Sequence, residues 1–131
     1  MRALCDEHGA VLIFDEVSAA FREQCGGRHL AFGVDPDICT FSKTLSNGFA
    51  MAALLGRPEV MRSAQDTFIS TTYHTERIGP AAALATLRKF VACDVQAVIC
   101  RRGAALKRGW TTAAAGAGLP IVVGGLSLIH I

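Results

Sequence analysis

An apolar run near the start of the chain sets the fold class. Val11-Leu12-Ile13-Phe14 shows no alternation of apolar and polar residues, which is typical of a strand buried on both faces, as in a parallel sheet. The preceding residues 2–8 have the pattern of a helix end, and Gly9 fits the glycine that commonly stops a helix. We therefore predict a helix, then a strand over residues 10–14, and an α/β fold.

The middle of the chain continues this alternation. Residues 18–34 are rich in Gly, Arg and Gln and predict a loop with a short helix. Turn signals at Pro36-Asp37 and Asn47-Gly48 frame the next elements. The predicted elements are strands over residues 38–41 and 51–55 and a helix opened by Arg57-Pro58-Glu59, with Pro at its start.

Two longer helices are predicted in the second half. Apolar residues recur at helical spacing over residues 76–90 and 94–115, and Cys93-Asp94 offers a break and an N-cap between them. Residues 113–131 contain no Asp, Glu, Lys or Arg, but glycines and Pro120 interrupt them. This favours a helix end, a turn and a short strand Ile121-Val122-Val123 over a membrane span.

Composition excludes several classes of protein. The 131 residues are 51% hydrophobic and 18% charged, as in a globular protein with a sizeable core. Thirteen Lys and Arg and eleven Asp and Glu form no run of like charge, which argues against a nucleic-acid or membrane-surface partner. The five cysteines include no C-x-x-C pair, which argues against a disulfide framework and a zinc site. With no signal-peptide pattern, we predict a cytoplasmic protein without a metal.

Asp15 and Lys43 are the residues most suited to chemistry. Asp15 closes the apolar run, and Lys43 follows the strand predicted over residues 38–41. Open α/β sheets bind ligands at the carboxyl ends of their strands, so both residues fall where a site is expected. A Lys that forms an imine and an acid that keeps the ring nitrogen protonated are what pyridoxal phosphate requires. Each also has a plain structural explanation, as a loop-capping carboxylate and an ordinary surface lysine.

Two other interpretations remain open on these residues. An apolar run that ends in Asp15-Glu16 also fits the strand of an ATPase whose acids hold magnesium. That class requires a phosphate loop of the form G-x-x-x-x-G-K-[ST], and Lys43-Thr44 is preceded by Thr40-Phe41-Ser42 in place of glycines. The third interpretation is a non-catalytic domain that keeps only the fold.

Several ordered blocks resemble one enzyme family. They are Ile13-Phe14-Asp15-Glu16-Val17, Phe21-Arg22, Phe32-Gly33-Val34-Asp35-Pro36-Asp37, Phe41-Ser42-Lys43-Thr44-Leu45-Ser46-Asn47-Gly48 and the segment Phe68 to Pro80. In this order and spacing they resemble the class III pyridoxal-phosphate aminotransferases, and within them the branch that contains glutamate-1-semialdehyde aminomutase. A match of several ordered blocks is far more specific than a single motif.

The resemblance implies a role for each matching residue. Asp15 would salt-bridge the pyridine nitrogen of pyridoxal 5'-phosphate, and Lys43 would form the imine with its aldehyde and then shuttle a proton as a free amine. Val17 would press on the ring face. Thr75 would bind the cofactor phosphate from the neighbouring subunit of a homodimer, near the start of a helix whose N–H groups could add donors; Thr75 would otherwise be a helix N-cap.

Departures from the family pattern bear on the substrate. Many relatives have Gln where this chain has Ser18, and a Gly-Gly-Asn-Pro ending where it has Arg77-Ile78-Gly79-Pro80. His74 is not assigned a catalytic role, because a lone His is more often structural. The resemblance implies a small-molecule amine donor and a carbonyl acceptor, and it does not separate an aminotransferase from an aminomutase.

The resemblance also predicts a division of the chain. As a fold-type I enzyme fragment, residues 1–92 would form part of the large α/β/α pyridoxal-phosphate domain, and residues 93–125 a connecting helix and the start of the small C-terminal domain. Residues 126–131 resemble a non-native tail. We expect both ends to be cut, so that the fragment alone is inactive and the longer protein that contains it, here called the parent protein, is the enzyme.

Overall fold

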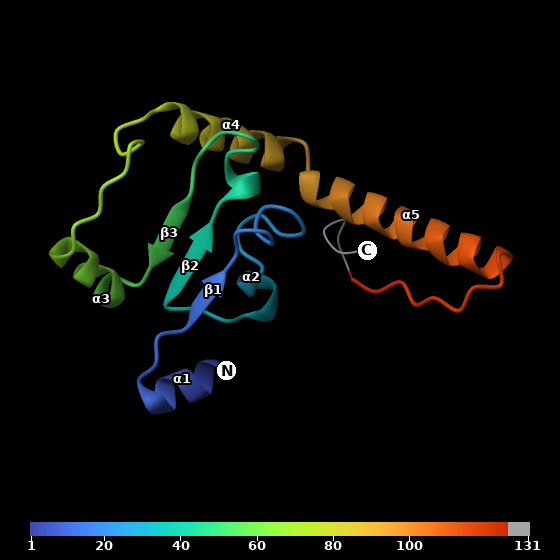
Figure 1. The fold of residues 1–131 in the computed structure, drawn as a ribbon, viewed down its shortest axis with the longest axis horizontal. Coiled ribbons are helices and arrows are strands. Elements are labelled where there is room, and N and C mark those ends of the chain that lie inside the picture. Colours follow the sequence, from blue (N-terminus) through green and yellow to red (C-terminus); the bar gives the residue numbers. More distant parts are fainter. Residues whose placement is uncertain (126–131) are drawn as a thin grey trace.

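The computed structural model describes residues 1–125, which form a small sheet with helices beside it (Figure 1). The sheet has the strand order β1-β2-β3, and the strands are β1 (Ile13–Asp15), β2 (Ile38–Phe41) and β3 (Ala53–Gly56). β1 and β2 are parallel, and β2 and β3 are antiparallel. The predicted α/β class is confirmed.

The helices follow the predicted order. They are α1 (Arg2–His8), α2 (His29–Phe32), α3 (Pro58–Met61), α4 (Ile78–Ala92) and α5 (Val95–Gly116), with short 3-10 helices η1 (Lys43–Leu45) and η2 (Arg62–Asp66). Gly9 ends α1 in the left-handed conformation, with φ of 63°. Asp94 separates α4 from α5 and caps α5 by accepting the Ala97 N–H at 3.4 Å, as predicted. Within residues 1–125, no helix has both the length and the apolar character required to cross a bilayer.

The prediction for the first strand is partly wrong. β1 starts at Ile13 instead of residue 10, and it is not buried on both faces, since Ile13 and Asp15 are exposed and Phe14 is half-buried. The sheet face that bears Ile13 also bears Leu54 of β3, which is exposed too. The helices cover the opposite face, so β1 is covered on one side only within residues 1–125.

The short strand predicted at residues 121–123 is also absent, because these residues have no regular structure. A strand needs a neighbour to pair its backbone N–H and C=O groups, and none of the three described strands pairs with this segment. The non-native tail predicted at residues 126–131 lies outside the described residues.

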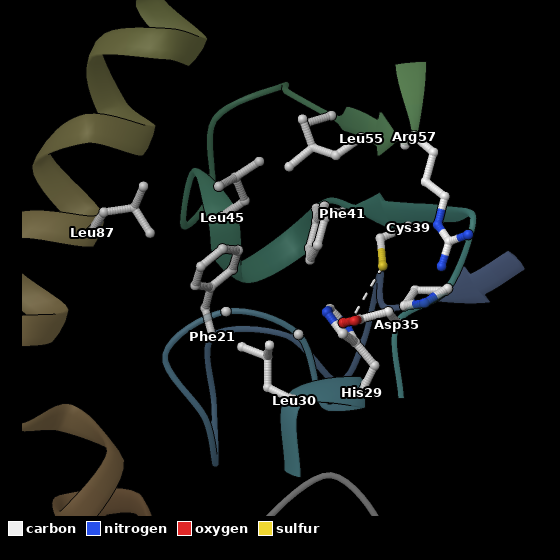
Figure 2. A pocket seen from close by; sticks show the side chains of 15 residues that line it. Phe21, His29, Leu30, Asp35, Cys39, Phe41, Leu45, Leu55, Arg57 and Leu87 are labelled. Carbon is white, nitrogen blue, oxygen red and sulfur yellow. Dashed lines mark hydrogen bonds between the residues drawn. The ribbon is translucent and has the colours of Figure 1, made fainter. Parts of the chain in front are cut away.

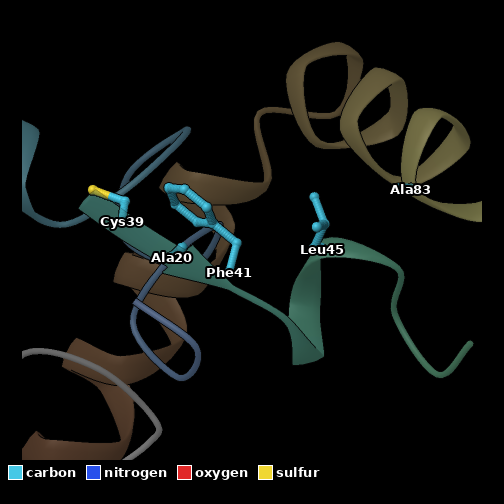
Figure 3. Close-up of a cluster of buried hydrophobic side chains, with 5 residues drawn as sticks. All are labelled: Ala20, Cys39, Phe41, Leu45 and Ala83. Carbon is cyan, nitrogen blue, oxygen red and sulfur yellow. The ribbon is translucent and has the colours of Figure 1, made fainter. Parts of the chain in front are cut away.

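The core joins the covered face of the sheet to α4 (Figure 3). Its buried members come from β2, η1, α4 and the loop after β1, and they are Ala20, Cys39, Phe41, Leu45 and Ala83. The rings of Phe21 and Phe41 lie 5.8 Å apart. Full burial of one such aromatic side chain stabilises a fold by about 1.5–3 kcal/mol. Phe41 therefore contributes substantially to the packing of β2 against the loop after β1 and α4.

Asp37 connects the start of β2 to three other segments. Its carboxylate accepts the Leu12 N–H at 2.7 Å and the Arg2 guanidinium at 2.8 Å, and Arg57 lies 3.5 Å away. The Leu12 N–H, followed by Arg2, lowers the pKa of this buried carboxyl. These contacts hold α1, the entry to β1 and the end of β3 together.

α4 packs closely on the segment before β3. A Cβ added at Gly79 would lie 2.9 Å from the Ala50 carbonyl oxygen, so only glycine permits this approach. The first turn of α4 is thereby fixed beside the loop that follows η1.

Candidate active site at the strand ends

The register of β1 and β2 brings the two predicted chemical groups to one edge of the sheet. Asp15 is the last residue of β1 and is paired with Thr40 of β2. Lys43 comes just after β2 and opens η1. Parallel strands end at the same edge, so Asp15 and Lys43 occupy neighbouring strand ends, where the sequence predicted them; their chemical roles stay predictions.

Asp15 is held by one of its two carboxylate oxygens. Oδ1 accepts the Val17 N–H at 3.0 Å and the Thr40 hydroxyl at 3.3 Å. Within residues 1–125, Oδ2 accepts no hydrogen bond, and the side chain is exposed. One oxygen therefore fixes the carboxylate, and the other is open to a cationic partner.

Lys43 is presented by an uncommon backbone conformation. Its φ is 45°, in the left-handed region that few non-glycine residues adopt. The amine Nζ donates a hydrogen bond to Ser18 Oγ, and no carboxylate forms an ion pair with it in the described chain. The exposed amine is thus held by a neutral hydroxyl.

Ser18 is a site residue that the sequence did not reveal. It marked a departure from the family pattern, yet the structure places its hydroxyl on Lys43. Its position on the loop directly after the Asp15-Glu16-Val17 block was the available signal. Val17 is half-buried beside Asp15, and its backbone N–H anchors that carboxylate.

Thr75 is not brought into this group. It is exposed at the end of a turn over residues 72–75, and within residues 1–125 its side chain has no hydrogen bond to Asp15 or Lys43. Its alternative role as a helix N-cap is wrong. Arg77 is the N-cap residue, and the Glu76 carboxylate accepts the N–H groups of Ile78 and Gly79.

Glu76 therefore occupies the helix donors that were predicted for the cofactor phosphate. The N–H of Gly79, followed by that of Ile78, lowers the pKa of the Glu76 carboxyl. A phosphate near Thr75 would have to use other donors or displace this carboxylate.

A cavity of about 630 Å³ lies on the side of the sheet opposite to Asp15 (Figure 2). Cys39 and Phe41 line it, and they alternate with Thr40 along β2. Since alternate residues of a strand point to opposite faces, the cavity is separated by the sheet from Asp15 and Thr40. Neither Asp15 nor Lys43 lines it.

Glu16 lies on the cavity side of the sheet, and its structural role was not predicted from the sequence. It is 2% exposed, and its Oε1 accepts the His29 N–H at 2.8 Å and lies 3.1 Å from His29 Nδ1. The Cys39 thiol lies 3.5 Å from the same nitrogen, and burial, followed by the charge of Glu16, raises its pKa.

The direction of Glu16 bears on the magnesium interpretation. Asp15 and Glu16 are consecutive in extended backbone, which continues the ladder through Glu16 N–H to Thr40 O at 3.0 Å. Their side chains therefore diverge, with Asp15 exposed and Glu16 buried against His29. The pair does not converge on one ion, and the ATPase interpretation is not supported.

Comparisons with known proteins find similarity to one enzyme family. The family model "Aminotransferase class-III" matches residues 1–119. A 2'-deamino-2'-hydroxyneamine transaminase from Streptomyces kanamyceticus is 36% identical over 92% of this chain and 31% of its own length. A glutamate-1-semialdehyde 2,1-aminomutase from Haloarcula marismortui is 40% identical over 83% of this chain and 25% of its own.

Solved structures share the fold at high similarity. The FumI protein of Sphingopyxis in its "PLP internal aldimine form" has a TM-score of 0.87 and 31% identity, over 95% of this chain and 30% of that one. An omega-transaminase from Sphaerobacter thermophilus has a TM-score of 0.85 and 28% identity, over 96% and 30%. The chain thus spans less than a third of the curated relatives described above.

Proposed function

Because the chain belongs to the class III aminotransferase family, we propose that the parent protein moves an amino group with pyridoxal 5'-phosphate held by Asp15 and Lys43. The observation that carries this proposal is the placement of a carboxylate and an amine at neighbouring strand ends, neither of them in an ion pair within residues 1–125. Neither an added metal nor a nucleotide is required by these groups.

The residues present fit this cofactor. It requires an anion for its ring nitrogen and a primary amine for its aldehyde, and the site offers Asp15 Oδ2 and Lys43 Nζ. Lys43 forms no ion pair with a carboxylate within residues 1–125, so its amine is not committed to a salt bridge. When bound, the cofactor supplies a ring that takes up the electrons released as a substrate C–H bond breaks.

Asp15 keeps the ring nitrogen protonated. Val17 N–H and Thr40 Oγ1 fix Oδ1, so the carboxylate does not have to reorganise when Oδ2 faces the cation. A charge held ready in this way is the usual source of electrostatic stabilisation in enzymes. Val17, half-buried beside it, would pack against the ring.

Lys43 has two successive duties. Its amine would hold the cofactor covalently between turnovers. As a free amine, Lys43 Nζ would accept the proton of the substrate carbon and return it. The exposed position of Lys43 at the strand end leaves its amine accessible to an incoming substrate.

Thr75 would complete the site across a homodimer. Its hydroxyl is exposed and forms no hydrogen bond within residues 1–125, so it is available to a partner. We propose that Thr75 of one subunit binds the cofactor phosphate of the other. This assignment predicts that the active unit is a dimer.

The substrates are an amine donor and a carbonyl acceptor, and both aminotransferase and aminomutase chemistry fit. The relatives carry both kinds of name. We further propose the division into a partial large domain (1–92) and a connecting helix with the start of a small domain (93–125), with the boundary at the α4–α5 break. A cytoplasmic location and an inactive isolated fragment stay predictions.

Absorbance of the purified parent protein tests this function. We expect a visible band that is lost on addition of an amine donor and returns with a carbonyl acceptor. Stabilisation by nucleotide without such a band would favour an ATPase, and neither response would favour a non-catalytic domain. Either of these results contradicts the proposal.

A further inference from the structure

The Lys43 amine has a single hydrogen-bond partner among residues 1–125, and that partner is Ser18. Nζ donates to Ser18 Oγ, and Ser18 is half-buried on the loop between β1 and α2. The contact joins the loop after β1 to the turn after β2. It therefore links the two strand ends through side chains as well as through the backbone ladder.

The main chain around Ser18 is fixed on both sides. Val17 N–H donates to Asp15 Oδ1 at 3.0 Å, and Arg22 Nε donates to the Ser18 carbonyl at 2.8 Å. The carboxylate assigned to the ring nitrogen thus also anchors the turn that presents the hydroxyl. The backbone on both sides of the Ser18 side chain is therefore held by hydrogen bonds.

The wider loop is closed by a buried contact. Glu16 Oε1 accepts the His29 N–H at 2.8 Å, and this joins the two ends of the segment that carries Ser18. A Cβ added at Gly27 would lie 3.0 Å from Glu16 Oε1 and 2.3 Å from His29 Nδ1. A side chain at this position would displace His29 or Glu16, so Gly27 is part of the closure.

We propose that Ser18 is a positioning residue for Lys43. Its hydroxyl accepts a hydrogen bond from Nζ whenever the amine is not bonded to the cofactor, and it holds the amine beside the loop that starts at Asp15. A free lysine side chain has many rotamers, and proton transfer depends on keeping the donor and acceptor oriented. This inference rests on the proposed function of Lys43.

Ser18→Val and Ser18→Thr in the parent protein test the proposal, since they have the same shape and differ by the hydroxyl. With the cofactor bound, we expect kcat to fall about tenfold in Ser18→Val, the effect of losing one hydrogen bond to a charged group. Ser18→Thr should stay within about twofold of wild type. KM for the amine donor should change little in both, because Ser18 acts through Lys43. Ser18→Ala repeats the comparison without adding bulk.

A second readout needs no cofactor. In the apo parent protein at one fixed pH, Lys43 should react several-fold faster with an amine-reactive reagent in Ser18→Val and Ser18→Ala than in wild type and Ser18→Thr, as measured by peptide mass spectrometry. Ser42→Ala is the matched control, because Ser42 Oγ donates to Met51 O at 3.0 Å and not to Lys43.

Equal Lys43 labelling in all Ser18 variants, together with equal kcat in Ser18→Val and Ser18→Thr, would overturn the positioning role. Failure of the proposed function has a different signature. In that case the cofactor would attach to another lysine, while the labelling rate of Lys43 would still depend on the Ser18 hydroxyl.

Discussion

Thr40 and Asp15 are direct partners in the parallel β1–β2 ladder, and the Thr40 hydroxyl donates to Asp15 Oδ1 at 3.3 Å. One strand therefore orients the carboxylate at the end of its neighbour. The arrangement explains how an exposed Asp15 keeps a defined direction, with Oδ1 in use and Oδ2 open.

Replacement of Thr40 tests this orientation. Thr40→Val keeps the shape and removes the hydrogen bond, so we expect pyridoxal phosphate to dissociate about three- to tenfold more readily from the parent protein, as the loss of about 1 kcal/mol implies. Thr40→Ser, which keeps the hydroxyl, should be close to wild type. Titration of the cofactor band measures both, and equal affinity of Thr40→Val and Thr40→Ser would show that the contact is unimportant.

Replacement of Asp15 tests the charge. Asp15→Asn retains an oxygen for the Val17 N–H but loses the negative charge, so kcat should fall by about 100-fold or more while the thermal midpoint changes little. Asp66→Asn, a change of an exposed acid in η2, serves as the control and should be neutral. Steady-state kinetics that left Asp15→Asn within a few-fold of wild type would count against a role at the ring nitrogen.

The Glu16 contact should matter for stability. Glu16→Ala leaves the His29 N–H without its acceptor in a partly buried site, at a cost of about 1–3 kcal/mol, and should lower the thermal midpoint of the parent protein. Glu16→Gln keeps an acceptor oxygen and should lose less. Glu7→Ala, at an exposed position of α1, is the control. A Glu16→Ala variant with the same thermal midpoint as wild type would show that the Glu16–His29 contact does not stabilise the fold.

Asp37 gives the chain an acid-dependent component of stability. Hydrogen bonds from Leu12 and Arg2 lower the pKa of the Asp37 carboxyl in the folded state. The stabilisation of the fold by the ionised carboxylate is therefore present above about pH 4, which is near the pKa of an unfolded Asp. It is lost as the pH falls through the lower pKa of the folded state. Asp37→Asn should be less stable at neutral pH, with the difference shrinking in acid. Thermal melting curves recorded between about pH 3 and about pH 7 measure this difference, and Asp35→Asn is the control. A difference in thermal midpoint between Asp37→Asn and wild type that stays constant with pH would refute the linkage.

Local patterns were enough to predict most elements of the fold. Helical spacing and the Asp94 cap located α4 and α5 within a few residues, and Gly9 marked the end of α1. The apolar run placed Asp15 at a strand end. The prediction that β1 is buried on both faces was wrong. Burial depends on which elements cover the sheet, and the local sequence pattern does not encode that.

The contacts that organise the site arise from tertiary structure. Ser18 reaches Lys43, and Glu16 reaches His29, only after the loop between β1 and α2 has folded back. No periodicity signals such contacts. The strand predicted at residues 121–123 failed for a related reason, because β-pairing requires a partner that the segment itself cannot supply.

The most direct test of the account is to identify the lysine that carries the cofactor. The parent protein is loaded with pyridoxal phosphate, reduced with borohydride, digested and mapped by mass spectrometry, with unreduced protein as the control. The account predicts that the stable pyridoxyl label lies on Lys43. A label on any other lysine, with Lys43 unmodified, would contradict it.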